Sequence, residues 1–185
     1  MLAIISCLLL NDIVNDEGYL TPGAILDRLH QSIVKTLKQN SNRATTNDGL
    51  DIALCRFDTE TNELLFAGAH RPLYHYSNGK MNRTKGNSYP IGGCHYDKSR
   101  RGYDDKYVQL KEGDGVFIFS DGLPDQFGGE HEDKYGTGFM KGYLLDMMNN
   151  NCKMSAIEKA VDIDLKRWQN DKAQLDDILL IGVKI

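Results

Sequence analysis

The sequence predicts one α+β domain spanning residues 1–185, in which helices flank a run of mostly antiparallel strands. Two observations lead to this prediction. Apolar residues recur at helical spacing near both ends of the chain, whereas residues 49–120 form short apolar runs separated by turn residues. Strands do not alternate with helices in this central part, so a parallel βαβ sheet is not expected.

Two helices are expected at the N-terminal end. Residues 1–10 are uncharged and largely apolar, and the pattern predicts a first helix over residues 1–16. Thr21 and Pro22 form a typical cap and first turn for a second helix, which reaches about Gln39. A polar loop over residues 40–48 follows.

The centre of the chain is expected to form strands. Residues 51–58 are apolar on both faces until Arg56, which is typical of a central strand. Residues 63–69 and 72–76 predict two further strands, and residues 77–79 (SNG) predict a hairpin turn. Residues 86–104 form a long irregular stretch, and loops of that length are usually functional or mobile.

The C-terminal part alternates less regularly between strands and helices. Strands are expected over residues 107–110 and 116–120, joined by a Gly-rich turn. Helical spacing then predicts two helices, over residues 137–149 and 154–169. Residues 178–185 predict a last strand.

Composition excludes several classes of protein. Hydrophobic residues make up 41% of the chain and charged residues 26%, as in ordinary globular domains, and the net charge of -4 argues against a nucleic-acid partner. The four cysteines have no zinc-binding spacing, so we expect reduced thiols and a cytoplasmic protein. The apolar run at residues 1–10 is too short for a membrane segment and lacks the flanks of a signal peptide.

Acidic residues stand at the ends of two predicted strands. Asp121 follows the apolar strand 116–120 and precedes Gly122, while Asp176 and Asp177 open the final strand. If these strands are neighbours, their carboxylates converge, and such oxygens suit Mg²⁺ or Mn²⁺. Asp-Gly is also a common turn, and an acidic pair before a strand is also typical of a solvated boundary.

Six short motifs are spread over nearly the whole chain. They are residues 48–54 (DGLDIAL), 66–73 (FAGAHRPL), 89–93 (YPIGG), 110–114 (LKEGD), 119–122 (FSDG) and 176–177 (DD). Together they resemble the metal-dependent protein phosphatases of the type 2C superfamily, in the SpoIIE (stage II sporulation protein E) branch. The resemblance implies an α-β-β-α sandwich of mostly antiparallel sheets, which in this chain would lack its N-terminal strands.

The resemblance also implies a function and a set of site residues. Family members hold two or more Mg²⁺ or Mn²⁺ ions, and a metal-bound water attacks the phosphorus of phosphoserine or phosphothreonine in line. Asp121 and Asp176 resemble metal ligands with catalytic roles, and Asp125 resembles an auxiliary metal carboxylate. Gly122 keeps the approach to the site open. The implied substrate is a phosphorylated protein of the anti-anti-sigma type in bacterial signalling.

Two further residues are placed near this site by the resemblance. Asp177 matches a position at which the residue varies within the family. It would therefore either contact the metal ligands without binding the metal or be exposed to solvent. His70 lies in a turn that resembles the family's Ala-Gly-His-Pro turn, and it could line the site or be a structural histidine.

One family motif is missing from the sequence. The first metal ligand of the family lies in an Asp-x-x-Gly-His-Gly motif before the helix that residues 1–14 resemble, and no segment here replaces it. We therefore expect the chain to hold about two-thirds of a phosphatase domain, to bind Mn²⁺ weakly or not at all, and to have little activity. The alternative is a catalytically silent phosphatase-like domain that binds a partner. Missing strands would also expose sheet edges, which favours self-association.

The chemistry of the cysteine phosphatases is not expected here. Residues 94–100 (CHYDKSR) satisfy the Cys-x5-Arg spacing of cysteine phosphatases. That chemistry needs a loop of backbone N–H groups at a helix N-terminus and a low-pKa thiolate. The loop has no internal glycine, and the Asp97 carboxylate would repel phosphate.

Overall fold

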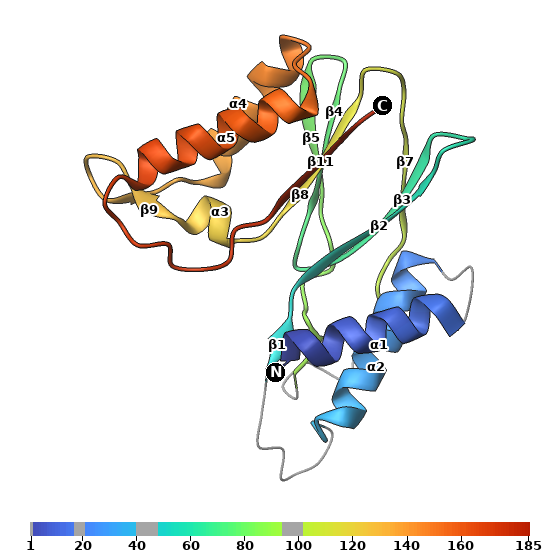
Figure 1. The fold of residues 1–185 in the computed structure, drawn as a ribbon. Helices are drawn as coiled ribbons and strands as arrows, with labels where there is room; N and C mark the ends of the chain where they lie inside the picture. Colours follow the sequence, from blue (N-terminus) through green and yellow to red (C-terminus); the bar gives the residue numbers. More distant parts are fainter. Residues whose placement is uncertain (1, 17–20, 40–47, 94–101) are drawn as a thin grey trace. The chain divides into compact units, whose positions relative to one another are not determined.

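The computed structural model describes residues 2–16, 21–39, 48–93 and 102–185 (Figure 1). The chain divides into two compact units, residues 1–73 with 84–110 and residues 74–83 with 111–185. Neighbouring strands within each sheet pair in the antiparallel sense, and helices stand at both ends of the chain, as the α+β prediction requires. No helix in the described part of the chain is long and apolar enough to cross a membrane.

The first unit contains the two predicted N-terminal helices, α1 (Leu2–Asp16) and α2 (Pro22–Thr36). The Thr21 side chain accepts a hydrogen bond from the Ala24 N–H at 3.3 Å, and Pro22 fills the first turn, so the predicted cap is present. The buried face of α2 carries its regularly spaced aliphatic residues, and these form one core with Ala67 and Ala69.

The strands of the first unit form a three-stranded sheet and a short pair. The sheet has the order β2 (Ile52–Asp58), β3 (Glu63–Ala69), β7 (Lys106–Gln109), and the pair joins β1 (Gly49–Leu50) to β6 (Ile91–Gly92). Among the described strands β3 is therefore central and β2 lies at an edge, so the central position predicted for residues 51–58 is wrong. The apolar residues of β2 are instead half-buried, and Ile52 and Leu54 pack against the core that α2 covers.

The second unit is built on a four-stranded sheet with the order β11 (Leu180–Lys184), β8 (Gly115–Phe119), β4 (Leu73–Ser77), β5 (Lys80–Thr84). The predicted hairpin joins β4 to β5, and its Asn78 and Gly79 both have positive φ, which suits a tight hairpin turn. Helices α4 (Thr137–Asn149) and α5 (Met154–Gln169) contribute Leu144 and Ile157 to a core around Phe117.

Three short elements of the second unit were not predicted. They are the single-turn helix α3 (Gly122–Asp125) and the paired strands β9 (Phe127–Gly128) and β10 (Asp133–Lys134). Each is too short to show a hydrophobic period, which explains why the pattern does not reveal it.

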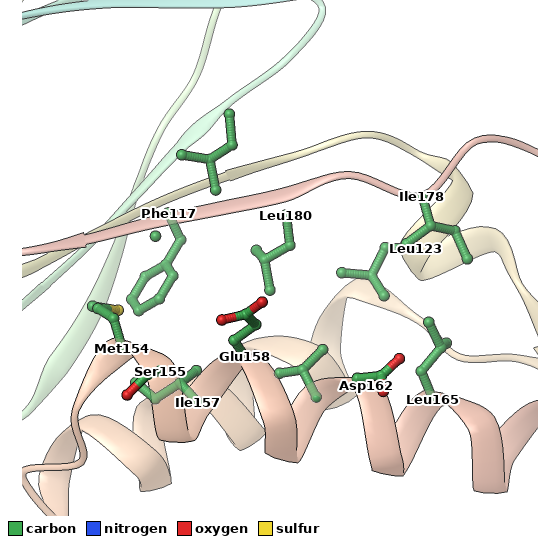
Figure 2. A pocket seen from close by; sticks show the side chains of 13 residues that line it. Phe117, Leu123, Met154, Ser155, Ile157, Glu158, Asp162, Leu165, Ile178 and Leu180 are labelled. Atoms are coloured by element: carbon green, nitrogen blue, oxygen red, sulfur yellow. The ribbon is translucent and has the colours of Figure 1, made fainter.

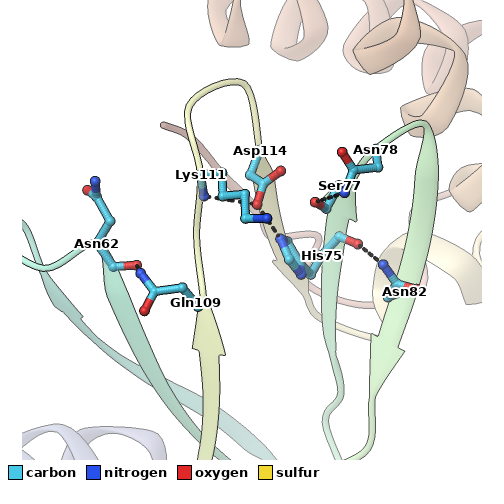
Figure 3. Close-up of polar contacts among 8 residues, drawn as sticks. All are labelled: Asn62, His75, Ser77, Asn78, Asn82, Gln109, Lys111 and Asp114. Atoms are coloured by element: carbon cyan, nitrogen blue, oxygen red, sulfur yellow. Dashed lines mark hydrogen bonds and ion pairs between the residues drawn. The ribbon is translucent and has the colours of Figure 1, made fainter.

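A buried carboxylate closes the turn that precedes β8 (Figure 3). Asp114 is 4% exposed, and its Oδ2 lies 2.9 Å from His75 Nε2 on β4 and accepts the Lys111 backbone N–H at 3.1 Å. Burial raises the pKa of Asp114, but hydrogen bonds from His75, Ser77 and the Lys111 N–H outweigh this effect and lower the pKa overall. The ionised carboxylate therefore stabilises the folded state.

We expect this stabilisation to disappear in acid. Because the folded-state pKa of Asp114 is lowered, its contribution is fully present above the unfolded value of about 3.9 and is lost as the pH falls through the folded value. Asp114→Asn should lower the free energy of unfolding by about 1.5–3 kcal/mol at neutral pH. Denaturant unfolding of both proteins should show this difference shrinking below about pH 4. A difference that is constant with pH would contradict this account.

Candidate functional site

The strand pairing brings the two acidic segments of the second unit to one end of its sheet. Strands β8 and β11 are antiparallel neighbours, and Phe119 lies opposite Leu180. Asp121 follows the end of β8, and Asp176 and Asp177 precede the start of β11, so the two segments lie at the same end. The adjacency on which the predicted carboxylate pair depended is therefore present.

The Ser120 hydroxyl holds these two segments together. Its Oγ donates to the Asp177 carbonyl oxygen at 2.8 Å and accepts the Leu179 backbone N–H at 2.9 Å. The Ser120 backbone N–H also donates to the Leu179 carbonyl oxygen at 3.0 Å. Three hydrogen bonds at one residue thus fix the acidic segment before β11 against the end of β8.

Gly122 is required here because two backbones approach closely. A Cβ atom built on Gly122 would lie 2.9 Å from the Asp177 carbonyl carbon, closer still to its oxygen, and 3.2 Å from the Asp176 carbonyl oxygen. Real Cβ atoms do not sit this close to a backbone carbonyl group, so any larger residue would push the segments apart. Glycine therefore sets the distance between the Asp121 and Asp176 backbones.

The four carboxylates of this region differ in their surroundings. Asp121 is half-buried at the N-cap position of α3, and its side chain does not cap that helix. Asp176 is exposed, and its Oδ1 accepts the Asp177 backbone N–H at 2.7 Å. Asp177 is exposed, and Asp125 forms an ion pair with Lys134 at 3.1 Å. Asp125 is the residue predicted as an auxiliary metal ligand, and Lys134 competes with a metal ion for its carboxylate.

His70 lies in the first unit, in a turn where its backbone is left-handed. Its φ is +56°, a value that is uncommon for residues other than glycine, although histidine adopts it more often than most. Its Nδ1 lies 3.0 Å from Asp51 Oδ1, and Arg71 pairs with the other oxygen of the same carboxylate at 3.1 Å. Asp51 therefore orients both side chains, which gives His70 at least a structural role.

The donor chemistry at the end of β8 and β11 fits a hard divalent cation in part. Asp121 and Asp176 offer carboxylate oxygens, which Mg²⁺ and Mn²⁺ prefer, and the backbone approach at Gly122 keeps their segments adjacent. Within the described residues, however, no group of three or more His, Cys, Asp or Glu side chains is arranged to hold a metal ion. These residues therefore fit as part of a ligand set.

Sequence reasoning missed two residues that build this region. Ser120 belongs to the recognised FSDG motif, but its bonds to the opposite segment depend on strand pairing. Gln126 is buried, and its Nε2 donates to the carbonyl oxygens of Phe127 and Ala173. The bond to Ala173 holds the segment that leads to Asp176 against the end of α3. No signal in the sequence could have found Gln126, because α3 is itself too short to be predicted. The Cys-x5-Arg segment, residues 94–100, lies outside the described residues.

Comparison with known proteins identifies the class. The family model for stage II sporulation protein E (SpoIIE) matches residues 7–185. The chain therefore belongs to the SpoIIE family, the phosphatase branch that its motifs resemble. No curated protein sequence matches the chain.

Solved structures agree with this family. The SiaA PP2C domain of Pseudomonas aeruginosa is 27% identical over 98% of this chain and 68% of its own, with a TM-score of 0.82. The PP2C domain of Bacillus subtilis SpoIIE, with a regulatory-domain fragment, is 18% identical over 97% of this chain, with a TM-score of 0.69. This chain spans about half, 49%, of that SpoIIE chain.

A third solved structure is that of RsbX in complex with magnesium, which is 14% identical over 96% of this chain and 71% of its own, with a TM-score of 0.60. At identities this low, the SpoIIE and RsbX structures show a shared fold alone. The fold of this chain is therefore the mixed helix and antiparallel-sheet fold of the PP2C phosphatases, as the resemblance implied.

Proposed function

We propose that this chain is a metal-dependent serine/threonine phosphoprotein phosphatase domain. The observation that carries the proposal is the clamp between the FSDG segment and the Asp176–Asp177 pair in a chain of the SpoIIE family. We use the word clamp for Ser120 and Gly122, which hold the two acidic segments together at one end of the sheet. Such an arrangement would allow the carboxylates of both segments to bind the same cation.

The residues of the clamp would divide the work as follows. Asp121 and Asp176 would bind Mg²⁺ or Mn²⁺, and Ser120 and Gly122 would keep the two carboxylates at a fixed separation. When bound, the cation would supply an acidified water and neutralise charge on the phosphoryl group. Asp125 would join a further cation only after releasing Lys134, and Asp177 would contribute through its carbonyl contact with Ser120.

The absent Asp-x-x-Gly-His-Gly motif limits the activity that we propose for this chain. Asp121 and Asp176 provide only part of the ligands that a binuclear centre requires. We therefore expect weak Mn²⁺ binding and slow turnover.

A phosphatase assay tests this proposal. The 185-residue chain should release phosphate slowly from a phosphoserine or phosphothreonine peptide, only with Mn²⁺ or Mg²⁺, and the rate should keep rising through the millimolar range of metal. A parallel assay with an aryl phosphate reports the chemistry without peptide recognition. Turnover that persists in excess chelator would contradict the metal-dependent mechanism.

A catalytically silent binding module is the second candidate. The ion pair between Asp125 and Lys134 favours it, because this pair occupies a carboxylate that the phosphatase would use for a metal ion. This candidate predicts no phosphate release at any metal concentration, together with measurable binding of a phosphorylated partner. The assay above therefore separates the two functions.

The proposed partner is a phosphorylated protein of the anti-anti-sigma type, and the proposed setting is bacterial signalling in the cytoplasm. The SpoIIE family supports the proposed partner, and the four cysteines, which we expect to be reduced thiols, support the cytoplasmic setting.

A further inference from the structure

The segment that carries Asp176 has no regular structure of its own. Residues 170–177 follow α5 and lie outside every helix and strand, and all of them are exposed. An exposed segment of this kind keeps one conformation only where other parts of the chain hold it. The position of Asp176 therefore depends on the contacts made by the residues on either side of it.

The C-terminal side of Asp176 is held by polar and apolar contacts. The Ser120 hydroxyl donates to the Asp177 carbonyl oxygen. The next residue, Ile178, packs against the core of the second unit, and Figure 2 shows it beside Leu123, with which it lines a groove of about 610 Å³. This side is therefore fixed by a hydrogen bond and by packing.

The N-terminal side of Asp176 depends on a hydrogen bond from a buried side chain. Leu175 is 66% exposed, so it does not anchor the segment in the core. Lys172 pairs with Glu132, but both side chains are exposed, and such pairs contribute little to stability. The remaining contact is the bond from Gln126 Nε2 to the Ala173 carbonyl oxygen, at 3.1 Å. Among the described residues, this is the only hydrogen bond that links residues 170–175 to a buried side chain.

The backbone of Gln126 is itself fixed. Its carbonyl oxygen accepts the Tyr135 backbone N–H at 2.8 Å and the Trp168 indole N–H at 3.2 Å. Helix α3 directly precedes Gln126, and Asp121 is the N-cap residue of this helix. Gln126 thus connects the turn that begins at Asp121 to the segment that carries Asp176.

The buried amide of Gln126 has one satisfied end and one unsatisfied end. Its Nε2 donates to the carbonyl oxygens of Phe127 and Ala173, so turning the amide over would place its oxygen against two acceptors. No protein group among the described residues donates to the buried Oε1. A buried acceptor without a donor lowers stability, and exceptions of this kind are expected where function rather than stability determines the residue. The amide is therefore best explained by the position that it gives to Ala173.

We propose that Gln126 is a positioning residue for the metal site, whose bond to Ala173 helps to set the separation of the Asp121 and Asp176 carboxylates. This inference rests on the proposed function, because it requires that both carboxylates bind one cation. Without the bond, the segment that carries Asp176 would be held firmly on its C-terminal side alone. Its carboxylate would then lie less often at the distance from Asp121 that a shared cation requires.

Gln126→Met tests the anchor without a metal ion. Methionine is also unbranched, but it donates no hydrogen bond, so the bond to Ala173 is lost. Trypsin cleaves after lysine, and Lys172 lies in the exposed segment. In brief digestion the variant should be cleaved at Lys172 about threefold faster or more than wild type, because the segment opens more easily. Equal cleavage rates would show that Gln126 does not hold the segment.

Calorimetric titration with Mn²⁺ tests whether the anchor affects the metal site. Gln126→Met should bind Mn²⁺ about tenfold more weakly than wild type, which is typical when a group that orients a metal ligand is removed. The control is Asp114→Asn, which we expect to destabilise the same unit from the opposite end of β8 and to leave the affinity unchanged. Equal losses of affinity in the two variants would show that reduced stability, rather than positioning, is the cause.

The two experiments separate this inference from the proposed function. Absence of Mn²⁺ binding by wild type would overturn the metal site, and the positioning role would fall with it. Binding by wild type with unchanged affinity in Gln126→Met would overturn the positioning role alone. Circular dichroism checks that each variant is folded. Should Gln126→Met not fold, Gln126→Asn decides, because its shorter amide no longer reaches Ala173. It should also weaken Mn²⁺ binding, and wild-type affinity in this variant would contradict the proposal.

Discussion

Replacing Asp121 with asparagine is expected to reduce the metal-dependent phosphatase rate by about 100-fold or more. Asparagine keeps the size of the side chain and removes the negative charge that a divalent cation requires. Because Asp121 is half-buried at the end of β8, its backbone position should not change. The phosphopeptide assay with Mn²⁺ measures this loss, and Asp176→Asn should produce a loss of the same size.

Asp162→Asn is the matched control for this prediction. Asp162 is an exposed carboxylate of the same unit, paired with Lys166 one helical turn away on α5, and its substitution changes the net charge by the same amount. Such an exposed pair is worth about 0.3–0.5 kcal/mol, so activity should be unaffected. Equal losses in Asp121→Asn and Asp162→Asn would show that general electrostatics, rather than a metal ligand, determines the rate.

Gly122→Ala is expected to cost about 1–3 kcal/mol of stability and to lower metal-dependent activity, although it removes no carboxylate. The added Cβ would collide with the backbone of Asp177, so the segment before β11 must move away from Asp121. Thermal unfolding and the phosphopeptide assay measure the two effects. Raising the Mn²⁺ concentration should recover part of the activity, because the ligands are displaced rather than lost.

Gly142→Ala provides the comparison for the glycine variant. A Cβ at Gly142, in α4, meets no atom within 4 Å, and alanine is the better helix former by about 1 kcal/mol. This variant should be as stable as wild type or more stable, with unchanged activity. Full activity in Gly122→Ala would contradict the idea that backbone separation at this point positions the carboxylates.

Much of the fold could be predicted because most elements show a clear period or turn signal. Strand β3 begins and ends at the predicted residues, 63–69, and helices α4 and α5 match the ranges 137–149 and 154–169. The edge position of β2 could not be predicted. Apolar residues on both faces of a strand indicate that other elements cover these faces, but they do not indicate whether the strand is central or at an edge of its sheet.

The sequence names candidate site residues, but it does not show how their segments are held together. The order of the FSDG and DD motifs pointed to Asp121 and Asp176, and the β8–β11 pairing explains why these segments meet. The clamp by Ser120 and the anchoring by Gln126 involve contacts across 57–59 and 47 residues of chain, which no local pattern encodes. The ion pair of Asp125 with Lys134 is more local, but it depends on the β9–β10 pairing, which no pattern in the sequence reveals.

The central claim is that Asp121 and Asp176 bind the same divalent cation. Calorimetric titration of the chain with Mn²⁺ tests this claim most directly, because it does not depend on the substrate or on turnover. Wild type should bind Mn²⁺ weakly, and Asp121→Asn and Asp176→Asn should each weaken binding by about tenfold or more. The double variant should bind little more weakly than either single variant, because both substitutions disrupt the same site. Wild-type affinity in either single variant, or no binding by the wild-type chain, would contradict the claim.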